Sequence, residues 1–266
     1  MRSFDEDESF AELVGRALEE QKAFENRRAT RLGRGAERLT VPAGGVLARL
    51  IPPGVVRMAL RQADRMAGLT IPAALQSHDP DDLTACDAAA LRVQAWAQGA
   101  NAATGSAAGW FGAAGLAVDL PATIALAARN VRATGVVYGF TENDDGERLF
   151  RLMVLDAATA LASEQRQNTL ISLNNLAREL SAPEMQYVLR NGGEWVIGKV
   201  VERVARQLGF NLARHKIGQI VPIIGAVVAA AVNASFQVDV ARAARYAYRQ
   251  RWLITRNALP APEWTA

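Results

Sequence analysis

The stretch from Lys216 to Arg251 constrains the fold more than any other part of the chain. It is almost wholly apolar from Ile217 to Ala231, and Val221-Pro222 suits a helix start, because proline lacks the N–H group that a first turn leaves unused. A helix that is apolar on all sides must be buried in protein or in lipid. The sequence therefore predicts a long buried helix here and leaves open which of the two surrounds it.

The lengths of the apolar runs favour burial in protein over a span through a membrane. A spanning helix needs about 20 consecutive apolar residues to cross the hydrocarbon core. The run from Ile217 to Ala231 is shorter, and Asn233 and Asp239 follow it closely. The run from Ala107 to Val118 is shorter still and ends at Asp119. We therefore predict core helices, with reversible insertion of an apolar hairpin into a membrane as the alternative.

Composition and net charge narrow the class of protein. The chain has 266 residues, of which 50% are hydrophobic and only 6% aromatic, and alanine is abundant. Such small side chains allow helices to pack closely. The net charge is only +3, and the basic residues are scattered along the chain, which argues against nucleic acid as a partner.

Two features indicate the cellular compartment. Cys86 is the single cysteine, so no internal disulfide can form and a reducing compartment is indicated. The segment from Met1 to Lys22 is acidic and amphipathic, unlike the basic start and apolar run of a signal peptide. We expect a cytoplasmic protein, with peripheral attachment at the inner face of the membrane as a further expectation.

Apolar residues recur at helical spacing along most of the chain, and no convincing alternating strand or hairpin turn is present. The predicted fold class is therefore all-α: a compact multi-helix bundle with Ala/Gly-rich buried helical hairpins. The predicted divisions are an N-terminal amphipathic helical extension at residues 1–40, a helical domain at residues 46–256 and a tail at residues 257–266.

Local signals predict where one central helix begins and ends. Asp79 followed by Pro80 is typical of a helix start, with Asp79 as the cap. This helix should end near Gly99. Its predicted inward-facing residues are Leu83, Leu91, Val93 and Trp96.

The next boundaries follow from proline, glycine and threonine. Asp119-Leu120-Pro121 interrupts an apolar run, so we predict that a fresh helix extends from there to about Val137. Gly139 is then predicted to stop the chain from continuing as a helix, and Thr141 to cap the helix that follows.

Two blocks of sequence together resemble the EcsC protein family, and the resemblance spans roughly Ala85 to Leu253. The motifs that carry it are Gly109-Trp110-Phe111-Gly112-Ala113-Ala114-Gly115, Asp119-Leu120-Pro121 and Gly139-Phe140 in the first block, and Val221 to Val228, Asn233, Val240 to Ala247 and Arg251 in the second. The family takes its name from a companion of ABC-transporter components. The resemblance therefore implies proximity to a membrane, and it implies no particular reaction.

Three residues form the predicted ligand-binding set: Asp119, Asn233 and Trp110. Asp119 is an acid in apolar surroundings, where desolvation would raise its pKa, but the local sequence suits it better as the cap of the helix that starts at Leu120-Pro121, and the two roles can coexist. Asn233 can contact a ligand, or it can fix the helix register through a buried amide pair. A core of small side chains that leaves a slot between helices would suit an apolar ligand.

A basic row near the end of the long stretch is the predicted surface contact. Its arginines fall on one helical face, and contacts with anionic lipid headgroups are worth about 1 kcal/mol each. The nearby indole supports an interfacial position. The alternative is a solvated face neutralised by acids such as Glu202 or Asp239. The predicted membrane or partner contacts are Arg242, Arg245, Arg249 and Trp252.

The sequence indicates no metal site and no cofactor. The only histidines, His78 and His215, have no partner at the spacing of metal ligands. Ser106 is not in the GxSxG motif of serine hydrolases, and the glycine-rich run around it lacks the GK[ST] ending of a phosphate loop. Cys86 is predicted to be a packed helical residue.

The sequence therefore favours a non-catalytic accessory protein near a membrane. Its predicted partner is a lipid or other apolar small molecule, an anionic membrane surface, or a membrane protein of the ABC-transporter type. Two alternatives stay open: a hydrolase-like enzyme with a polar site centred on Asp119, and a toxin-like helical protein that inserts into membranes.

Overall fold

The computed structural model describes residues 4–26, 53–67, 71–109, 112–160, 163–180, 193–206 and 222–259. Within these ranges every regular element is a helix, which confirms the predicted all-α fold. The elements are α1 (Phe4–Glu25), α4 (Pro53–Ala67), the short 3-10 helix η2 (Ala73–Gln76), α5 (Leu83–Gly109), α6 (Gly112–Val137), α7 (Asp145–Thr159), α8 (Ser163–Glu179), a helical segment at 193–206 and α10 (Pro222–Thr255).

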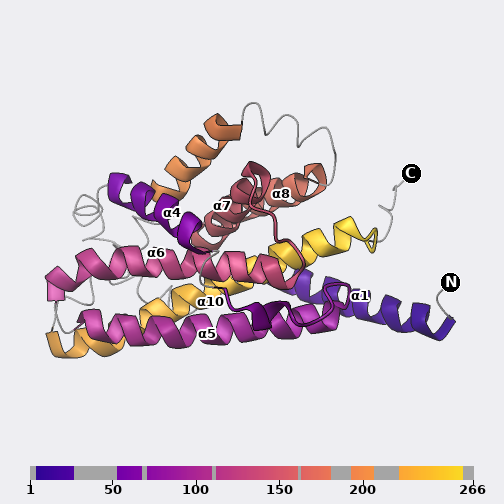
Figure 1. Ribbon diagram of the computed structural model, residues 1–266, viewed down its shortest axis with the longest axis horizontal. Coiled ribbons are helices and arrows are strands. Elements are labelled where there is room, and N and C mark those ends of the chain that lie inside the picture. The colour runs from indigo at the N-terminus through magenta and orange to yellow at the C-terminus, as the bar shows by residue number, and fades with distance from the viewer. Residues whose placement is uncertain are drawn as a thin grey trace.

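Three long helices form the body of the molecule (Figure 1). Helices α5 and α6 run antiparallel, and the end of α5 at Gly109 lies close to the start of α6 at Gly112. Helix α10 lies beside both of them and runs parallel to α6. Helices α4, α7 and α8 and segment 193–206 lie on one side of this body. Because α10 contacts α1, α5, α6, α7 and α8, the predicted long helix is the central element of the bundle.

An aromatic cluster fills the core where α6, α7 and α10 meet. The rings of Phe150 and Tyr248 lie 5.1 Å apart in an edge-to-face arrangement. Trp252 is buried, and its indole Nε1 donates a hydrogen bond of 2.8 Å to the carbonyl oxygen of Pro80. Gly135 on α6 allows α10 to approach closely, because a Cβ atom at this position would lie 2.7 Å from Cζ of Tyr248 on α10. The close contacts expected from the small side chains are therefore present at this crossing.

The α5 helix starts three residues later than predicted. Asp82, rather than Asp79, accepts hydrogen bonds from the N–H groups of Thr84 and Ala85, at 2.8 and 3.2 Å. Asp79 instead accepts from the N–H group of Asp81, and its carbonyl oxygen closes a turn with the N–H group of Asp82. In this acidic run, Asp79 therefore closes a turn, and Asp82, three residues later, caps the helix.

Because Asp82 is the cap, we expect Asp82→Ala to lower the free energy of unfolding more than Asp79→Ala does. Loss of an N-cap carboxylate costs about 1 kcal/mol of folding free energy, because two N–H groups at the helix start lose their acceptor. Urea unfolding of the two single variants measures the difference. A larger loss of stability for Asp79→Ala would instead support Asp79 as the cap, as the sequence predicted.

Two predicted boundaries inside the long helices are wrong. Helix α5 continues past Gly99 to Gly109, and α6 runs through Asp119 and Pro121 without interruption. One glycine costs a helix only about 1 kcal/mol and one internal proline about 3 kcal/mol. Packing of α5 and α6 along each other and along α10 outweighs these local preferences.

The inward face of α5 also differs in part from the prediction. Leu83 and Val93 are buried as expected, whereas Leu91 and Trp96 are each 48% exposed. The buried face uses small residues, among them Ala89, Ala90 and Ala97. The indole of Trp96 lies outside this face, where the guanidinium group of Arg129 sits 3.6 Å from the ring centre.

No helix in the described ranges combines the length and the apolar character needed to cross a bilayer.

Candidate functional site

The three predicted ligand-binding residues have different outcomes. Trp110 lies outside the described residues. Asp119 and Asn233 lie inside helices α6 and α10, and their side chains are also outside the described part. Since Asp119 is in the interior of a helix, the interpretation of this residue as an N-cap is wrong.

A buried polar cluster includes Thr123 and Gln237, one helical turn beyond Asp119 and Asn233 respectively, together with Asn130. Nε2 of Gln237 donates to the carbonyl oxygen of Thr123 at 3.2 Å, and Nδ2 of Asn130 donates to the carbonyl oxygen of Gln237 at 3.4 Å. All three side chains are buried between α6 and α10. Buried amides of this kind set the register of two helices, because a shift would break the hydrogen bonds that their NH2 groups donate.

The predicted basic row is not gathered into one exposed face. Arg242 and Arg245 are half-buried, and Nη1 of Arg242 lies 3.9 Å from Asp239. Arg249 is buried, with Nε and Nη2 donating to Asp87 at 2.9 and 2.7 Å.

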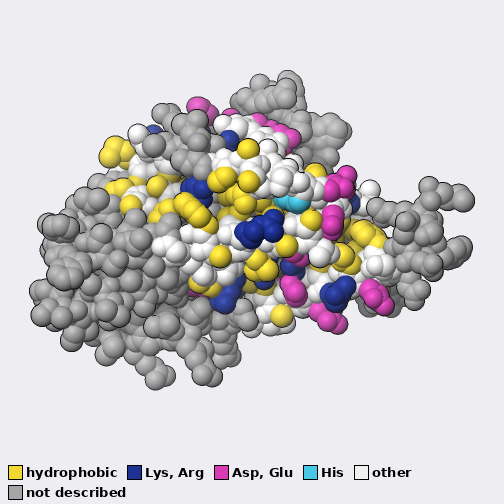
Figure 2. Space-filling view, turned by 60° about the horizontal axis from the view of Figure 1, so that its bottom comes forward, with side chains coloured by type: hydrophobic (Ala, Val, Ile, Leu, Met, Phe, Trp, Pro, Cys, Tyr) yellow, Lys and Arg dark blue, Asp and Glu magenta, His cyan; other side chains and the backbone are white. Residues whose placement is uncertain are grey.

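Trp252 is also buried, so it differs from the predicted interfacial indole. Nη1 of Arg249 donates to Glu20 at 2.6 Å, so this arginine joins α10 to both α5 and α1. On the face shown in Figure 2, basic side chains are scattered among hydrophobic ones.

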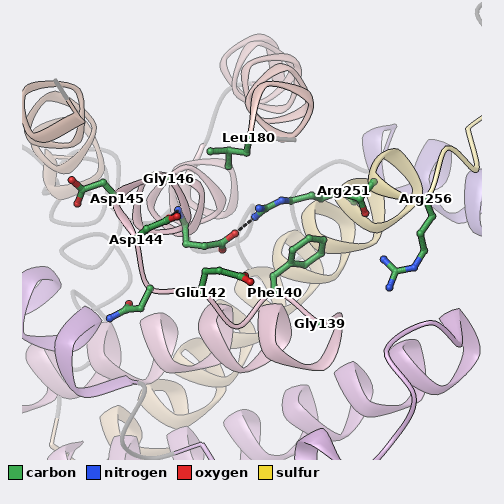
Figure 3. A pocket seen from close by; sticks show the side chains of 12 residues that line it. Gly139, Phe140, Glu142, Asp144, Asp145, Gly146, Leu180, Arg251 and Arg256 are labelled. Carbon is green, nitrogen blue, oxygen red and sulfur yellow. Dashed lines mark hydrogen bonds and ion pairs between the residues drawn. The ribbon is translucent and has the colours of Figure 1, made fainter. Parts of the chain in front are cut away.

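A pocket of about 650 Å³ opens where the α6–α7 connection, the start of α7 and the end of α10 meet (Figure 3). This volume is in the range of small-molecule sites. Residues from four parts of the chain line the pocket: Gly139, Phe140, Glu142, Asn143, Asp144, Asp145, Gly146, Glu147, Leu180, Arg251, Thr255 and Arg256.

Local backbone geometry explains how the α6–α7 connection reaches this position. Gly139 has φ of +87°, a left-handed conformation that glycine adopts without strain, and it ends α6 as predicted. The N–H group of Phe140 donates to the carbonyl oxygen of Gly135 at 2.9 Å. Asp144, rather than the predicted Thr141, caps α7 by accepting from the N–H group of Glu147 at 2.8 Å. The turn and the cap together place Phe140 and Glu147 at the pocket.

The buried ion pair between Glu147 and Arg251 joins α7 to α10 at this pocket. Nη1 of Arg251 donates to Oε1 of Glu147, and the contact is drawn as a dashed line in Figure 3. The two side chains are only 3% and 10% exposed. The guanidinium group also lies 4.2 Å from the ring centre of Phe140. Within the described structure, Oε2 of Glu147 and Nε of Arg251 have no hydrogen-bond partner.

The pocket lining carries more negative than positive charge. Among the described residues, the lining includes four carboxylates and two guanidinium groups, which gives these residues a net formal charge of −2. Burial raises the pKa of the Glu147 carboxyl above its ordinary value, although Arg251 and Arg151 act in the opposite direction. Arg256 already bonds to Asp81, with Nε 3.1 Å from Oδ1, so its charge is partly neutralised from outside the pocket.

The other candidate reactive groups do not join this pocket. Cys86 is buried, as predicted for a packed residue, and burial raises the pKa of its thiol to about 12. His78 shares a 2.7 Å hydrogen bond with the carbonyl oxygen of Val137. Among the residues that the structure describes, no group of three His, Cys, Asp or Glu side chains could hold a metal ion.

Comparisons with known proteins agree with the resemblance seen in the sequence. The chain is 27% identical over 160 residues to "Uncharacterized protein YdbA" of Bacillus subtilis (strain 168), which covers 59% of this chain and 54% of that protein. The chain thus spans about half the length of this relative. No solved structure matches the chain significantly. The model of the EcsC protein family matches residues 16–253, most of the sequence, so the chain belongs to the EcsC protein family.

Proposed function

We propose that this protein is a non-catalytic accessory protein that works at a membrane surface and holds the polar headgroup of a lipid in the α7–α10 pocket. The observation that supports this most is the buried carboxylate of Glu147, which lines the pocket with one oxygen unpartnered. A buried charged oxygen without a donor is costly. A ligand that donates a hydrogen bond to it would remove that cost.

The lining suits the polar end of an amphiphile. The lining combines the carboxylates of Glu142, Asp144 and Asp145 with the apolar side chains of Phe140 and Leu180. Ligand sites commonly combine apolar surface with a few polar groups that fix orientation. A headgroup would meet the carboxylates while the adjoining glycerol region contacts the apolar side chains.

An exposed tryptophan near the opening supports a position at a membrane surface. Segment 193–206 begins beside the pocket, because a Cβ atom on Gly193 would lie 3.5 Å from Cβ of Asp145. Two residues further along, Trp195 is 68% exposed, and Nζ of Lys199 lies 3.9 Å from its ring centre. Indoles and lysines are enriched at membrane–water interfaces. Trp195 therefore takes the interfacial role that the sequence assigned to Trp252.

A variant that narrows the pocket tests this function. Thr255 is exposed and lines the pocket, and its hydroxyl donates only to carbonyl oxygens of its own helix, at 3.0 Å. We expect Thr255→Phe to bind vesicles of phosphatidylethanolamine and phosphatidylglycerol several-fold more weakly than wild type in flotation.

The matched control is Ser172→Phe. Ser172 is exposed on α8, away from the pocket, and its hydroxyl likewise donates to a carbonyl oxygen one turn earlier, at 2.9 Å. This variant should float like wild type, because it adds the same ring without touching the pocket. Equal flotation of wild type and Thr255→Phe would reject headgroup binding at this pocket.

A further inference from the structure

We infer that the pocket recognises an ammonium group, supplied by an ethanolamine-type lipid headgroup or by a small free amine. This inference rests on the proposed function, because it names the chemistry of the ligand in the same pocket. It depends on three observations: the charge of the lining, the partners that the arginines already have, and the free oxygen of a buried carboxylate.

The charge balance favours a cation. The lining residues that the structure describes have a net formal charge of −2. Both of its guanidinium groups already have carboxylate partners, since Arg251 pairs with Glu147 and Arg256 with Asp81. By contrast, Glu142 and Asp145 have no ion pair with any residue that the structure describes. An anionic ligand would meet arginines that are already neutralised and carboxylates that are not.

The geometry of the buried ion pair adds a specific acceptor. Oε1 of Glu147 accepts from Arg251, while Oε2 is buried and has no partner in the described structure. Oε2 has almost no accessible surface, so an ammonium N–H would donate to it only after a small shift of the lining side chains, while Oε1 keeps its bond with Arg251. Its other two N–H groups are then available to further oxygen atoms of the lining, because an ammonium carries three donors. An apolar ligand would leave Oε2 without a donor.

Ammonium fits these carboxylates better than a metal ion does. In the described ranges no three acidic, histidine or cysteine side chains are close enough to share a metal ion. Hard cations such as calcium require six or more oxygen ligands. An ammonium needs only three hydrogen-bond acceptors, and backbone carbonyl or side-chain amide oxygens can serve as well as carboxylates.

Titrations followed by amide NMR test the inference, with ethanolamine and inorganic phosphate as probes at equal pH and ionic strength. The amides of Gly139 and Gly146, which line the pocket, serve as reporters. We expect ethanolamine to shift them and phosphate to leave them unchanged. Glu142→Gln combined with Asp145→Asn should raise the Kd for ethanolamine about fivefold, through loss of two charges of the lining. Glu12→Gln with Glu19→Gln removes two exposed charges on α1 and should not change the Kd.

The outcomes separate this inference from the proposed function. Shifts with phosphate alone would overturn the ammonium inference while leaving headgroup binding in place. If ethanolamine shifts the reporters but Thr255→Phe floats with vesicles like wild type, the ammonium inference holds, the ligand is a soluble amine, and the lipid function is rejected. If ethanolamine shifts neither reporter, or if the Glu142→Gln/Asp145→Asn variant binds ethanolamine as tightly as wild type, the ammonium inference is wrong.

Discussion

Replacing Glu147 by leucine is expected to lower the free energy of unfolding by about 3–5 kcal/mol at neutral pH, because it leaves Arg251 buried and unpaired. Both side chains are at least nine-tenths buried, and they connect α7 to α10. Arginine cannot lose its proton to escape the cost of burial. Chemical denaturation followed by circular dichroism measures the loss.

The reciprocal variant should behave differently. Arg251→Met leaves Glu147 buried, but a carboxyl group can take up a proton, so we expect a smaller loss than for Glu147→Leu. The pKa of Glu147 is already raised by burial and should rise further without Arg251. The stability contributed by a raised carboxyl pKa is present at low pH and is lost as the pH rises through that pKa. The deficit of Arg251→Met should therefore shrink as the pH falls.

The double variant Glu147→Leu/Arg251→Met completes the cycle. Since it removes both charges and keeps similar side-chain volumes, we expect it to lie within about 2 kcal/mol of wild type or to be more stable. If the double variant lost the sum of the two single effects, the two side chains would not act as a pair.

The second large effect is expected at Gly135. Gly135→Ala should lower the free energy of unfolding by about 2 kcal/mol, although alanine is the better helix former, because the added methyl group overpacks the core. Three atoms of the Tyr248 side chain would lie within 2.9 Å of the new Cβ atom. That ring is buried and packed against Phe140 and Phe150, so it has little room to move.

Gly99→Ala is the matched control on α5, where a Cβ atom would meet nothing within 4 Å. It should leave stability unchanged or raise it by up to about 1 kcal/mol. In a Tyr248→Leu background the penalty of Gly135→Ala should fall, because the clashing ring is gone. Thermal unfolding of these variants gives the comparison, and a Gly135→Ala protein that melts like Gly99→Ala would contradict the close contact.

Features that depend on local sequence could be predicted, and features that depend on distant partners could not. The start of α10 at Pro222 and the end of α6 before Gly139 follow from the backbone properties of proline and glycine. Asp82 was missed as a cap because several acids in succession could each fill that position, and only the packed turn selects one.

The candidate site depends even more on partners that are distant in the sequence. Glu147 and Arg251 form a pair across 104 residues of sequence, so no local pattern connects them. In the sequence, the region around Glu147 indicated only a helix start, with Thr141 as the predicted cap. Arg249 similarly looked exposed because its partners, Asp87 and Glu20, come from two helices distant in the chain.

Native mass spectrometry of protein purified without detergent tests headgroup binding most directly. We expect a population heavier than the 28.6 kDa chain by the mass of one phospholipid. That adduct should be retained in Ser172→Phe and largely lost in Thr255→Phe. A spectrum with the bare chain alone, or an adduct equally abundant in both variants, would contradict binding of a lipid headgroup in the α7–α10 pocket.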